Sequence, residues 1–417
     1  MPLFSWTGNP WVDGGLAVIV AKAGKENVEH LTKADLDALV SDGVWLAKAN
    51  RQLKTFTMVV GVNSPLTNPS LKKNDKGFKQ YCEMIQSLAK SAIADTGGEY
   101  RCEACGERPA TKVLAKYKKE VARDWFPLAG SIGSDAQALP AASRTARICS
   151  LCLLSVQFLP LGAIIIGGKI ACFQSIYPEL TQLIVAEVFK ETQDKLNLLG
   201  SDEKLSAVGQ GKGTKESLTM LLKIFTELQR NRRILELPPH ASLNVWLFSN
   251  SGQEPDCDVI EIPNEALLFI WDAARTYRRE IETILHREPK QISHQLLECI
   301  KRKTEYSGFY PFKSSKPASK GLFELYQTKV LGNSLASLRL AEWLSFEIEF
   351  RLSGGDKNDK KLLAKLQKEN AYWNKDKTVI AKLNGIIAQL VIFQLHSPTW
   401  FSGSFPQVQH PILDFLA

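Results

Sequence analysis

The chain has 417 residues, of which 44% are hydrophobic and 23% are charged, and 52 Lys and Arg against 44 Asp and Glu give a net charge of +8. These values exclude a disordered, fibrous or disulfide-scaffold protein, and the length is enough for two or three domains with hydrophobic cores. Most of the positive excess, +6, lies after residue 263. This asymmetry predicts a surface for a polyanion in the last third of the chain.

No segment has the pattern of a membrane anchor or a secretion signal. The N-terminal residues have no basic region before their apolar run, and the most apolar stretch, 158–168, has 11 residues where a spanning helix needs about 20. We therefore expect a cytoplasmic protein that does not bind membranes. In that reducing compartment, paired cysteines are more often metal ligands than disulfides.

The first 100 residues predict a mixed α/β domain. Enrichment in Val and Thr favours strands at 16–21 and 55–62. Between them, Thr32 begins a helix, with Asp35 three residues later as the partner in a capping box. Apolar residues at helical spacing predict a second helix over 78–94.

Residues 101–152 interrupt this pattern, which then resumes up to residue 263. The apolar run at 158–168 is interpreted as a buried strand. This strand is placed at 161–172, further strands are expected at 242–248 and 258–262, and helices are expected at 178–199 and 214–235.

After Pro263 the strand pattern stops. Helices are expected at 264–287, where Asn264 is the cap, and at 293–303, 322–352 and 357–395, with a loop at 307–320. The predicted fold class is therefore α+β. A mixed α/β platform comprises 1–100 and 153–263, a zinc-ribbon-like insertion spans 101–152, and a C-terminal helical bundle spans 264–417.

Two CxxC pairs are the strongest chemical signal, Cys102 with Cys105 and Cys149 with Cys152. Two intervening residues allow both sulfurs of a pair to bind one tetrahedral Zn²⁺, and Gly106 suits the tight turn after the first pair. Four thiolates leave no coordination position for water, so the expected zinc is structural. The 43 residues between the pairs exceed the usual spacing. Redox use of one CxxC and four unlinked buried thiols are the alternatives.

The other four cysteines occur singly in apolar or strand-like contexts, and we expect them to be core residues. They are Cys82, Cys172, Cys257 and Cys299.

The segment Trp6–Ile19, with the sequence WTGNPWVDGGLAVI, together with the two CxxC pairs of 102–152 resembles the CXXC–CXXC family of CRISPR-associated proteins. These proteins are large subunits of type I-B Cascade, the crRNA-guided surveillance complex. The resemblance implies a subunit at the crRNA 5′-handle end that recognises the protospacer-adjacent motif (PAM) on duplex DNA. It also implies that the subunit helps to open the duplex and positions the displaced strand.

The same resemblance implies the partners. They are crRNA, target double-stranded DNA, the backbone, 5′-handle and small subunits, and either a helicase-nuclease or a transposition adaptor, because related complexes also direct transposon insertion. The family's C-terminal part is a helical bundle that resembles the small subunit, which can be made from an internal start. Met220 is the only internal Met near such a start, and it is poorly placed for one.

Three basic stretches are the expected nucleic-acid contacts under this resemblance. The first, 204–233, has a net charge of +5 and contains the flexible loop Gly209–Gly213, which suits entry into a groove. An ordinary linker before a helix is the alternative. The residues assigned to contact nucleic acid here are Gln210, Lys212, Lys215, Arg230, Arg232 and Arg233.

The second stretch, 299–320, also has a net charge of +5 and carries Phe309, Tyr310 and Phe312. Lysines on phosphates and rings on bases would hold a single strand, whereas rings packed on the bundle are the alternative. The residues assigned here are Lys301, Arg302, Lys303, Lys313, Lys316 and Lys320. The third comprises Arg275, Arg278 and Arg279, expected on one helix face as a phosphate track or as a solvated surface.

Two further features are open to two interpretations. Asn9 lies in a turn-like segment, where it contacts a base or closes an Asx-turn before Pro10. Residues 101–123 carry a net charge of +4, with Tyr117 and Trp125 interleaved or adjacent. This composition suits either nucleic acid or the surface of a protein adaptor.

Motifs of catalysis are missing from the sequence: it has no HExxH, GxSxG, HD pair or Walker A motif. Cys257 lies between Asp256 and Asp258, whose charges raise a thiol pKa and disfavour a nucleophile. We therefore expect a non-catalytic protein. A zinc-stabilised protein adaptor without DNA readout and a zinc or thiol enzyme are the alternatives.

Overall fold

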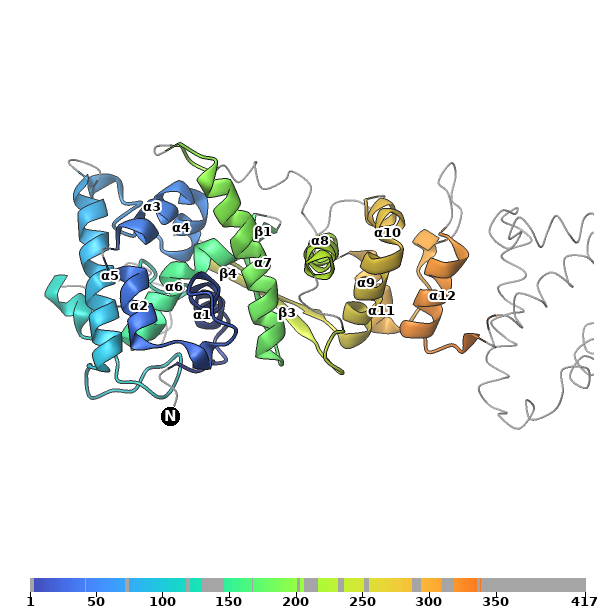
Figure 1. The fold of residues 1–417 in the computed structure, drawn as a ribbon, viewed down its shortest axis with the longest axis horizontal. Coiled ribbons are helices and arrows are strands. Elements are labelled where there is room, and N and C mark those ends of the chain that lie inside the picture. The colour runs from blue at the N-terminus through green and yellow to red at the C-terminus, as the bar shows by residue number, and fades with distance from the viewer. Residues whose placement is uncertain are drawn as a thin grey trace, which may run out of the picture. The chain divides into compact units, whose positions relative to one another are not determined.

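A computed structural model describes residues 4–41, 43–71, 75–117, 121–129, 146–166, 168–200, 203–205, 217–231, 236–250, 255–286, 294–309, 318–335 and 338 (Figure 1). The chain divides into two compact units, Met1–Arg278 with Leu285–Lys301, and Arg279–Ile284 with Arg302–Ala417. This division falls later in the chain than the predicted boundary at 263. The units are described separately below.

In the described residues before 95, five α-helices and short connecting turns form the first part of the first unit. The helix predicted after Thr32 is confirmed with its capping box, since Thr32 Oγ1 accepts the Asp35 N–H at 3.2 Å and an Asp35 carboxylate oxygen accepts the Thr32 N–H at 2.9 Å. The helices are α1 Pro10–Lys22, α2 Lys33–Val40, α3 Val44–Gln52, α4 Lys54–Val60 and α5 Lys76–Ala94.

The strands predicted at 16–21 and 55–62 are wrong, because these segments belong to α1 and α4. Residues Pro10–Val20 are buried on every side, so the run lacks the helical periodicity that a half-exposed helix would show. Asn9 and Pro10 begin this helix, with Asn9 as the N-cap. The Thr and Val residues of α4 favour a strand by intrinsic preference, but tertiary packing overrides this preference and the segment is helical.

The buried helix α6, Ser150–Gly162, forms the centre of the first unit and packs against α1, α5 and α7 (Figure 1). The strand interpretation of 158–168 is therefore wrong for its first half. Helices α1 and α6 approach so closely that a Cβ on Gly15 would lie 1.8 Å from the Ser155 carbonyl oxygen. The glycines of the N-terminal motif thus permit a close helix crossing.

The sheet of the first unit is antiparallel, in the order β1-β2-β3-β4. The strands predicted at 242–248 and 258–262 are confirmed, whereas the segment 161–172 contains the end of α6 and part of a hairpin. The strands are β1 Ile164–Ile166, β2 Lys169–Ser175, β3 Leu243–Asn250 and β4 Pro255–Ile262. Helices α7 Pro178–Asn197 and α8 Ser217–Arg230 lie at the positions of two predicted helices.

The N-terminal segment docks onto this sheet through aromatic and amide contacts. The Trp11 ring lies 5.8 Å from the Trp246 ring and 4.6 Å from the Phe248 ring, between centroids. Gln174 Nε2 donates to the Gly8 carbonyl at 2.7 Å, and Gln174 Oε1 accepts from Trp246 Nε1 at 2.8 Å. One amide side chain thus joins the N-terminal turn to β2 and β3.

The helix predicted over 264–287 is two helices, α9 Asn264–Thr276 and α10 Arg278–Leu285, because Tyr277 leaves the helical conformation with φ −123° and ψ 25°. Pro263 is the N-cap residue, so the prediction that Asn264 caps the helix is wrong; Asn264 Nδ2 donates to the Ala241 carbonyl at 3.0 Å. Helix α11 Gln295–Arg302 confirms the next predicted helix.

The described part of the second unit has a small aromatic core. The Phe309 ring lies 5.0 Å from both the Tyr306 and the Tyr326 ring centroids. Tyr326 lies in α12, Lys320–Lys329, which is shorter than the predicted helix over 322–352. The helix predicted at 357–395 lies outside the described residues, so the C-terminal bundle stays a prediction.

These elements confirm the α+β class, with a small antiparallel sheet and a cysteine cluster. Within the ranges described above, the longest apolar helices are too short or too polar to cross a membrane.

Candidate metal centre and nucleic-acid residues

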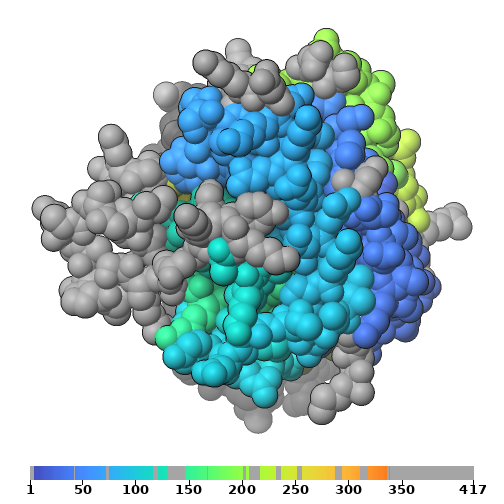
Figure 2. All heavy atoms as spheres, turned by 90° about the vertical axis from the view of Figure 1, so that its left-hand side faces the viewer, coloured from blue at the N-terminus to red at the C-terminus, as the bar shows by residue number. Residues whose placement is uncertain are grey.

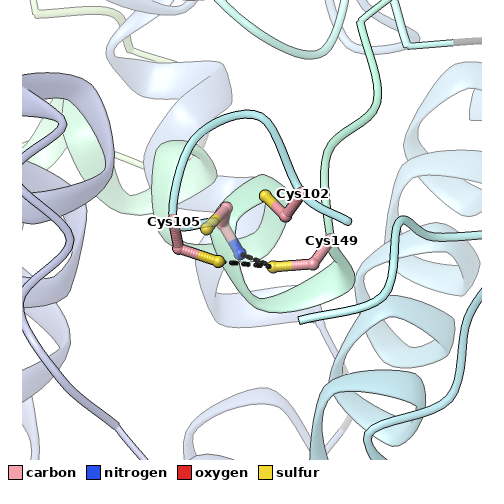
Figure 3. Close-up of side chains that lie close together, drawn as sticks. Cys102, Cys105 and Cys149 are labelled. Carbon is pink, nitrogen blue, oxygen red and sulfur yellow. Dashed lines mark hydrogen bonds between the residues drawn. The ribbon is translucent and has the colours of Figure 1, made fainter. Parts of the chain in front are cut away.

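Four cysteine sulfurs, those of Cys102, Cys105, Cys149 and Cys152, lie within 4.8 Å of one another. Cys105 Sγ is 4.0 Å from Cys149 Sγ, and the labelled side chains in Figure 3 point toward one another. Sulfurs bound tetrahedrally at about 2.3 Å from zinc would be separated by roughly 3.8 Å. A small inward movement of the side chains therefore gives the geometry of a Cys₄ zinc site.

The first pair, Cys102 and Cys105, lies in a tight turn that is closed by hydrogen bonds between backbone groups. Gly106, with φ +71°, donates its N–H to the Cys102 carbonyl at 2.8 Å, and Cys102 N–H donates to the Arg108 carbonyl at 2.8 Å. A left-handed φ is readily adopted by glycine, which explains its position after the pair.

The second pair begins α6. Cys149 is the N-cap residue, and its Sγ accepts the N–H of Cys152 at 3.4 Å. The positive end of the helix dipole favours thiolates at this position. The two pairs are joined by backbone bonds, since Glu103 N–H donates to the Arg147 carbonyl at 2.7 Å and Thr111 N–H to the Ile148 carbonyl at 2.8 Å. We call Tyr100–Thr111 and Ala146–Cys152 the metal module.

The four thiols interact with one another, so their ionisation is linked. Hydrogen bonds with the side chains of Cys102, Cys149 and Cys152 hold the pKa of the Cys105 thiol far below its ordinary value. Hydrogen bonds with the other three thiols, together with burial, raise the pKa of Cys152. A thiolate at Cys105 therefore disfavours ionisation of its neighbours, and a bound dication is needed for all four to ionise.

These observations fit a structural zinc ion. Cys102, Cys149 and Cys152 are buried and Cys105 is half-buried, so the donor set is shielded from water. Four thiolates would complete the coordination shell, and the ion would join the turn after Tyr100 to the start of α6.

A chain of hydroxyl groups, which the sequence analysis did not identify, links the metal module to α5. Ser150 Oγ lies 2.7 Å from Thr111 Oγ1 and donates to Ser91 Oγ at 2.7 Å. Arg108 adds an ion pair with Asp95 at 3.1 Å. The module is thus fixed to the helical core as well as to α6.

The remaining cysteines only partly match the core prediction. Cys172 is buried, whereas Cys82 and Cys299 are half-buried and Cys257 is exposed. The prediction is wrong for Cys257 because β4 is an edge strand among the described strands. Partial burial, followed by the charges of Asp258 and Asp256, raises the pKa of Cys257, in the direction expected from the sequence.

The turn-like N-terminal motif caps α1. Asn9 Oδ1 accepts the N–H groups of Trp11 at 3.1 Å and Val12 at 3.2 Å. The buried Asp13 carboxylate accepts the N–H and hydroxyl of Thr7 and the N–H of Gly8, all within 2.9 Å. These bonds give the motif a structural role, and the nucleic-acid role of Asn9 stays a prediction.

Among the assigned basic residues, some have acidic partners on their own helices. Arg230 lies 3.7 Å from Glu227, Lys301 lies 3.8 Å from Glu298, and Lys320 lies 3.9 Å from Glu324. Lys303 is exposed, with φ +52°. The assigned residues outside the described ranges are Gln210, Lys212, Lys215, Arg232, Arg233, Lys313 and Lys316.

Arg275, Arg278, Arg279 and Arg302 are exposed, and none of them forms an ion pair with any residue in the described ranges. The prediction that Arg275, Arg278 and Arg279 share one helix face is wrong. The helix breaks at Tyr277, which separates Arg275 in α9 from Arg278 and Arg279 in α10.

The rings expected to stack on bases are buried where the structure describes them. Trp125 has 1% of its surface exposed and packs on Tyr81, with 5.9 Å between ring centroids. Phe309 is fully buried in its aromatic core, in agreement with the alternative interpretation of that loop. Tyr310, Phe312 and the side chain of Tyr117 lie outside the described residues.

Comparison with known proteins supports a family for part of the chain. Residues 95–164 match the family model described as CRISPR-associated protein (Cas_CXXC_CXXC). This segment holds both cysteine pairs and the whole of α6, and it supports a CRISPR-associated protein of the CXXC–CXXC family with a role in CRISPR defence. Neither the search of curated proteins nor the search of solved structures gave a match.

Proposed function

We propose that this chain is the non-catalytic large subunit of a type I-B crRNA-guided surveillance complex. It recognises the PAM on duplex DNA, contributes to duplex opening and positions the displaced strand. Its partners are the crRNA, the target DNA, the other Cascade subunits and a helicase-nuclease or transposition adaptor. The complex acts in the prokaryotic cytoplasm.

One structural observation carries this proposal. The two regions that resemble the family, Trp6–Ile19 and 102–152, are far apart in sequence. In the fold, the first forms the capped start of α1 and the second ends at the start of α6, and α1 packs directly on α6. A combination of motifs that meets in one core is stronger support than either motif alone, and the family match covers the second of them.

The chemistry of the cysteine site supports a structural role for zinc. A closed Cys₄ shell leaves no position for an activated water, so the ion would supply a crosslink rather than a Lewis acid. Nucleic-acid binding would then depend on the basic residues, of which Arg275, Arg278, Arg279 and Arg302 are exposed cations.

The test is a complex reconstituted from this chain, crRNA and the other subunits, assayed for binding to a duplex library with randomised PAM positions. Enrichment of particular PAM sequences that requires this chain is the expected result. Replacing Lys212 and Lys215, or Lys313, Lys316 and Lys320, by Gln should weaken target binding and leave the unfolding temperature unchanged.

Two results would contradict the proposal. Unchanged DNA affinity in both sets of lysine variants, with assembly of the complex intact, would favour the zinc-stabilised protein adaptor. Turnover of nucleic acid or of a thiol substrate by the isolated chain would identify an enzyme.

A further inference from the structure

Tyr100 is an exposed aromatic residue at the edge of the metal module. Its exposed fraction is 56%, and it is the only aromatic among the exposed large hydrophobic residues of the described ranges. The Arg147 guanidinium carbon lies 3.6 Å from the centre of its ring, and Arg147 is itself exposed. The two side chains thus form a cation–π pair at the protein surface.

The metal site would hold both members of this pair in place. Tyr100 lies two residues before Cys102, and Arg147 lies two residues before Cys149. The Tyr100 carbonyl accepts the Ala110 N–H at 2.8 Å, and the Arg147 carbonyl accepts the Glu103 N–H at 2.7 Å. Because both backbones are fixed, little conformational entropy remains to be lost when a ligand stacks on the pair.

The module lies at the surface of the first unit. Figure 2 shows its cyan and green segments exposed beside the α5 segment. The other exposed charges in these segments are of both signs, with Arg101 and Lys112 against Glu99, Glu103 and Glu107. The surroundings therefore provide little net charge, and any ligand of the pair would be recognised mainly by stacking.

We propose that Tyr100 and Arg147 form a stacking platform for an unpaired base of single-stranded nucleic acid, held in place by the zinc-binding turns. This inference rests on the proposed function and assigns to that function a contact outside the basic stretches identified from the sequence. Every base has a π-face, so such a platform binds without sequence preference, and the guanidinium adds a cation–π contribution.

The burial of Trp125 and Phe309 supports this assignment. For both, the sequence left stacking on bases as one of two interpretations, and both are enclosed in the core. Among the aromatic residues of the described ranges, Tyr100 is the most exposed, and its guanidinium neighbour matches the chemistry of known base-stacking surfaces.

The experiment uses the full-length chain and a fluorescein-labelled single-stranded DNA of about 20 nucleotides, longer than a typical single site. Tyr100→Ala should weaken binding roughly five- to a hundredfold, and Tyr100→Trp should restore it. Because no charge is removed, the dependence of affinity on salt concentration should not change. Met58→Ala is the matched control, since Met58 is also exposed, with a fraction of 47%, but lies in α4.

A second measurement reports stacking directly. DNA with 2-aminopurine in place of one adenine should lose fluorescence on binding to the wild type, and this loss should be smaller with Tyr100→Ala. Zinc content and unfolding temperature should match the wild type, so that any change in binding arises from the ring.

The outcomes separate the two proposals. If the wild type binds DNA and Tyr100→Ala binds equally well, the platform is wrong and the proposed function stands. If the wild type binds neither this DNA nor a target duplex in the assembled complex, the proposed function fails and the platform with it. If Tyr100→Ala reduces only the binding of another subunit, the pair is a protein contact and the inference is overturned.

Discussion

The sulfur of Cys149 accepts the backbone N–H of Cys152 at 3.4 Å, so one residue is both a member of the metal site and the N-cap of α6. Helix α6 is buried along its whole length and contacts α1, α5 and α7. A site that the sequence places in an insertion is therefore continuous with the core of the first unit.

Loss of the metal should destabilise the first unit as a whole. Cys149→Ser removes the thiolate but keeps an atom that can cap the helix, whereas Cys149→Ala removes both. We expect both variants to lose zinc and unfold at lower temperature, with Cys149→Ala less stable by a further ~1 kcal/mol. Metal analysis and thermal unfolding, with and without a chelator, measure these effects. An unchanged unfolding temperature in zinc-free protein would contradict the prediction.

Two adjacent glycines should differ in their tolerance of alanine. A Cβ on Gly15 would meet the Ser155 carbonyl oxygen at 1.8 Å, whereas a Cβ on Gly14 would meet only the end of the Leu159 side chain at 2.8 Å. Gly15→Ala should therefore cost about 3 kcal/mol or more, and Gly14→Ala about 1 kcal/mol. Chemical denaturation measures both, and equal effects would show that α1 and α6 are not in close backbone contact.

Variants of Asn9 separate its structural role from a role in binding. Asn9→Ser keeps a cap for Trp11 and Val12, whereas Asn9→Ala removes it and should cost about 1 kcal/mol. If Asn9 only caps the helix, Asn9→Ser should bind target DNA as the wild type does. A loss of affinity in Asn9→Ser at unchanged stability would assign the amide to nucleic acid.

Glu191 should contribute to stability in a pH-dependent manner. Burial raises the pKa of its carboxyl, but hydrogen bonds and charge from Lys195 and Lys223 outweigh burial and lower the pKa below its ordinary value of 4.5. Its contribution is therefore present above pH 4.5 and is lost as pH falls through the lowered pKa of the folded state. The unfolding temperatures of wild type and Glu191→Gln should differ at pH 7 and converge in acid. A difference that is constant with pH would contradict this assignment.

Neutralising the exposed arginines should change the salt dependence of duplex binding. Removing one cation that binds a phosphate should make the slope of log affinity against log salt less steep by about 0.9. Replacing Arg275, Arg278 and Arg279 by Gln should therefore reduce the slope by about 2 to 3 if all three bind phosphates. Lys48→Gln, at an exposed position in α3, is the control. An identical slope in the triple variant would show that these residues face solvent.

The parts of the fold that followed from sequence are those with a local signal. Thr32 and Asp35 cap α2, the apolar spacing of 78–94 lies within α5, and the CxxC spacing identified four sulfurs that come together. The two helix signals and each CxxC pair depend on residues a few positions apart, where geometry is fixed by the element itself. The meeting of the two pairs across 43 residues followed from the need of one tetrahedral ion for four ligands.

The errors arose where long-range packing decides. The segment Leu16–Ala21 is apolar on every side because α6, α7 and β2 all pack on α1. Its sequence therefore shows no helical period of apolar and polar residues. Trp125 is buried because Tyr81, from a distant helix, stacks on it. Tyr100 and Arg147 carried no local signal except their identical spacing before each cysteine pair.

Trp11 can form its native contacts only after a much later part of the chain has been synthesised. Its ring packs on Trp246 and Phe248, and the turn before it is bonded through Gln174. At ribosomal rates of about 5–20 residues per second, β3 emerges roughly 10 to 50 s after α1. During that interval the nascent chain carries an apolar helix without its native cover.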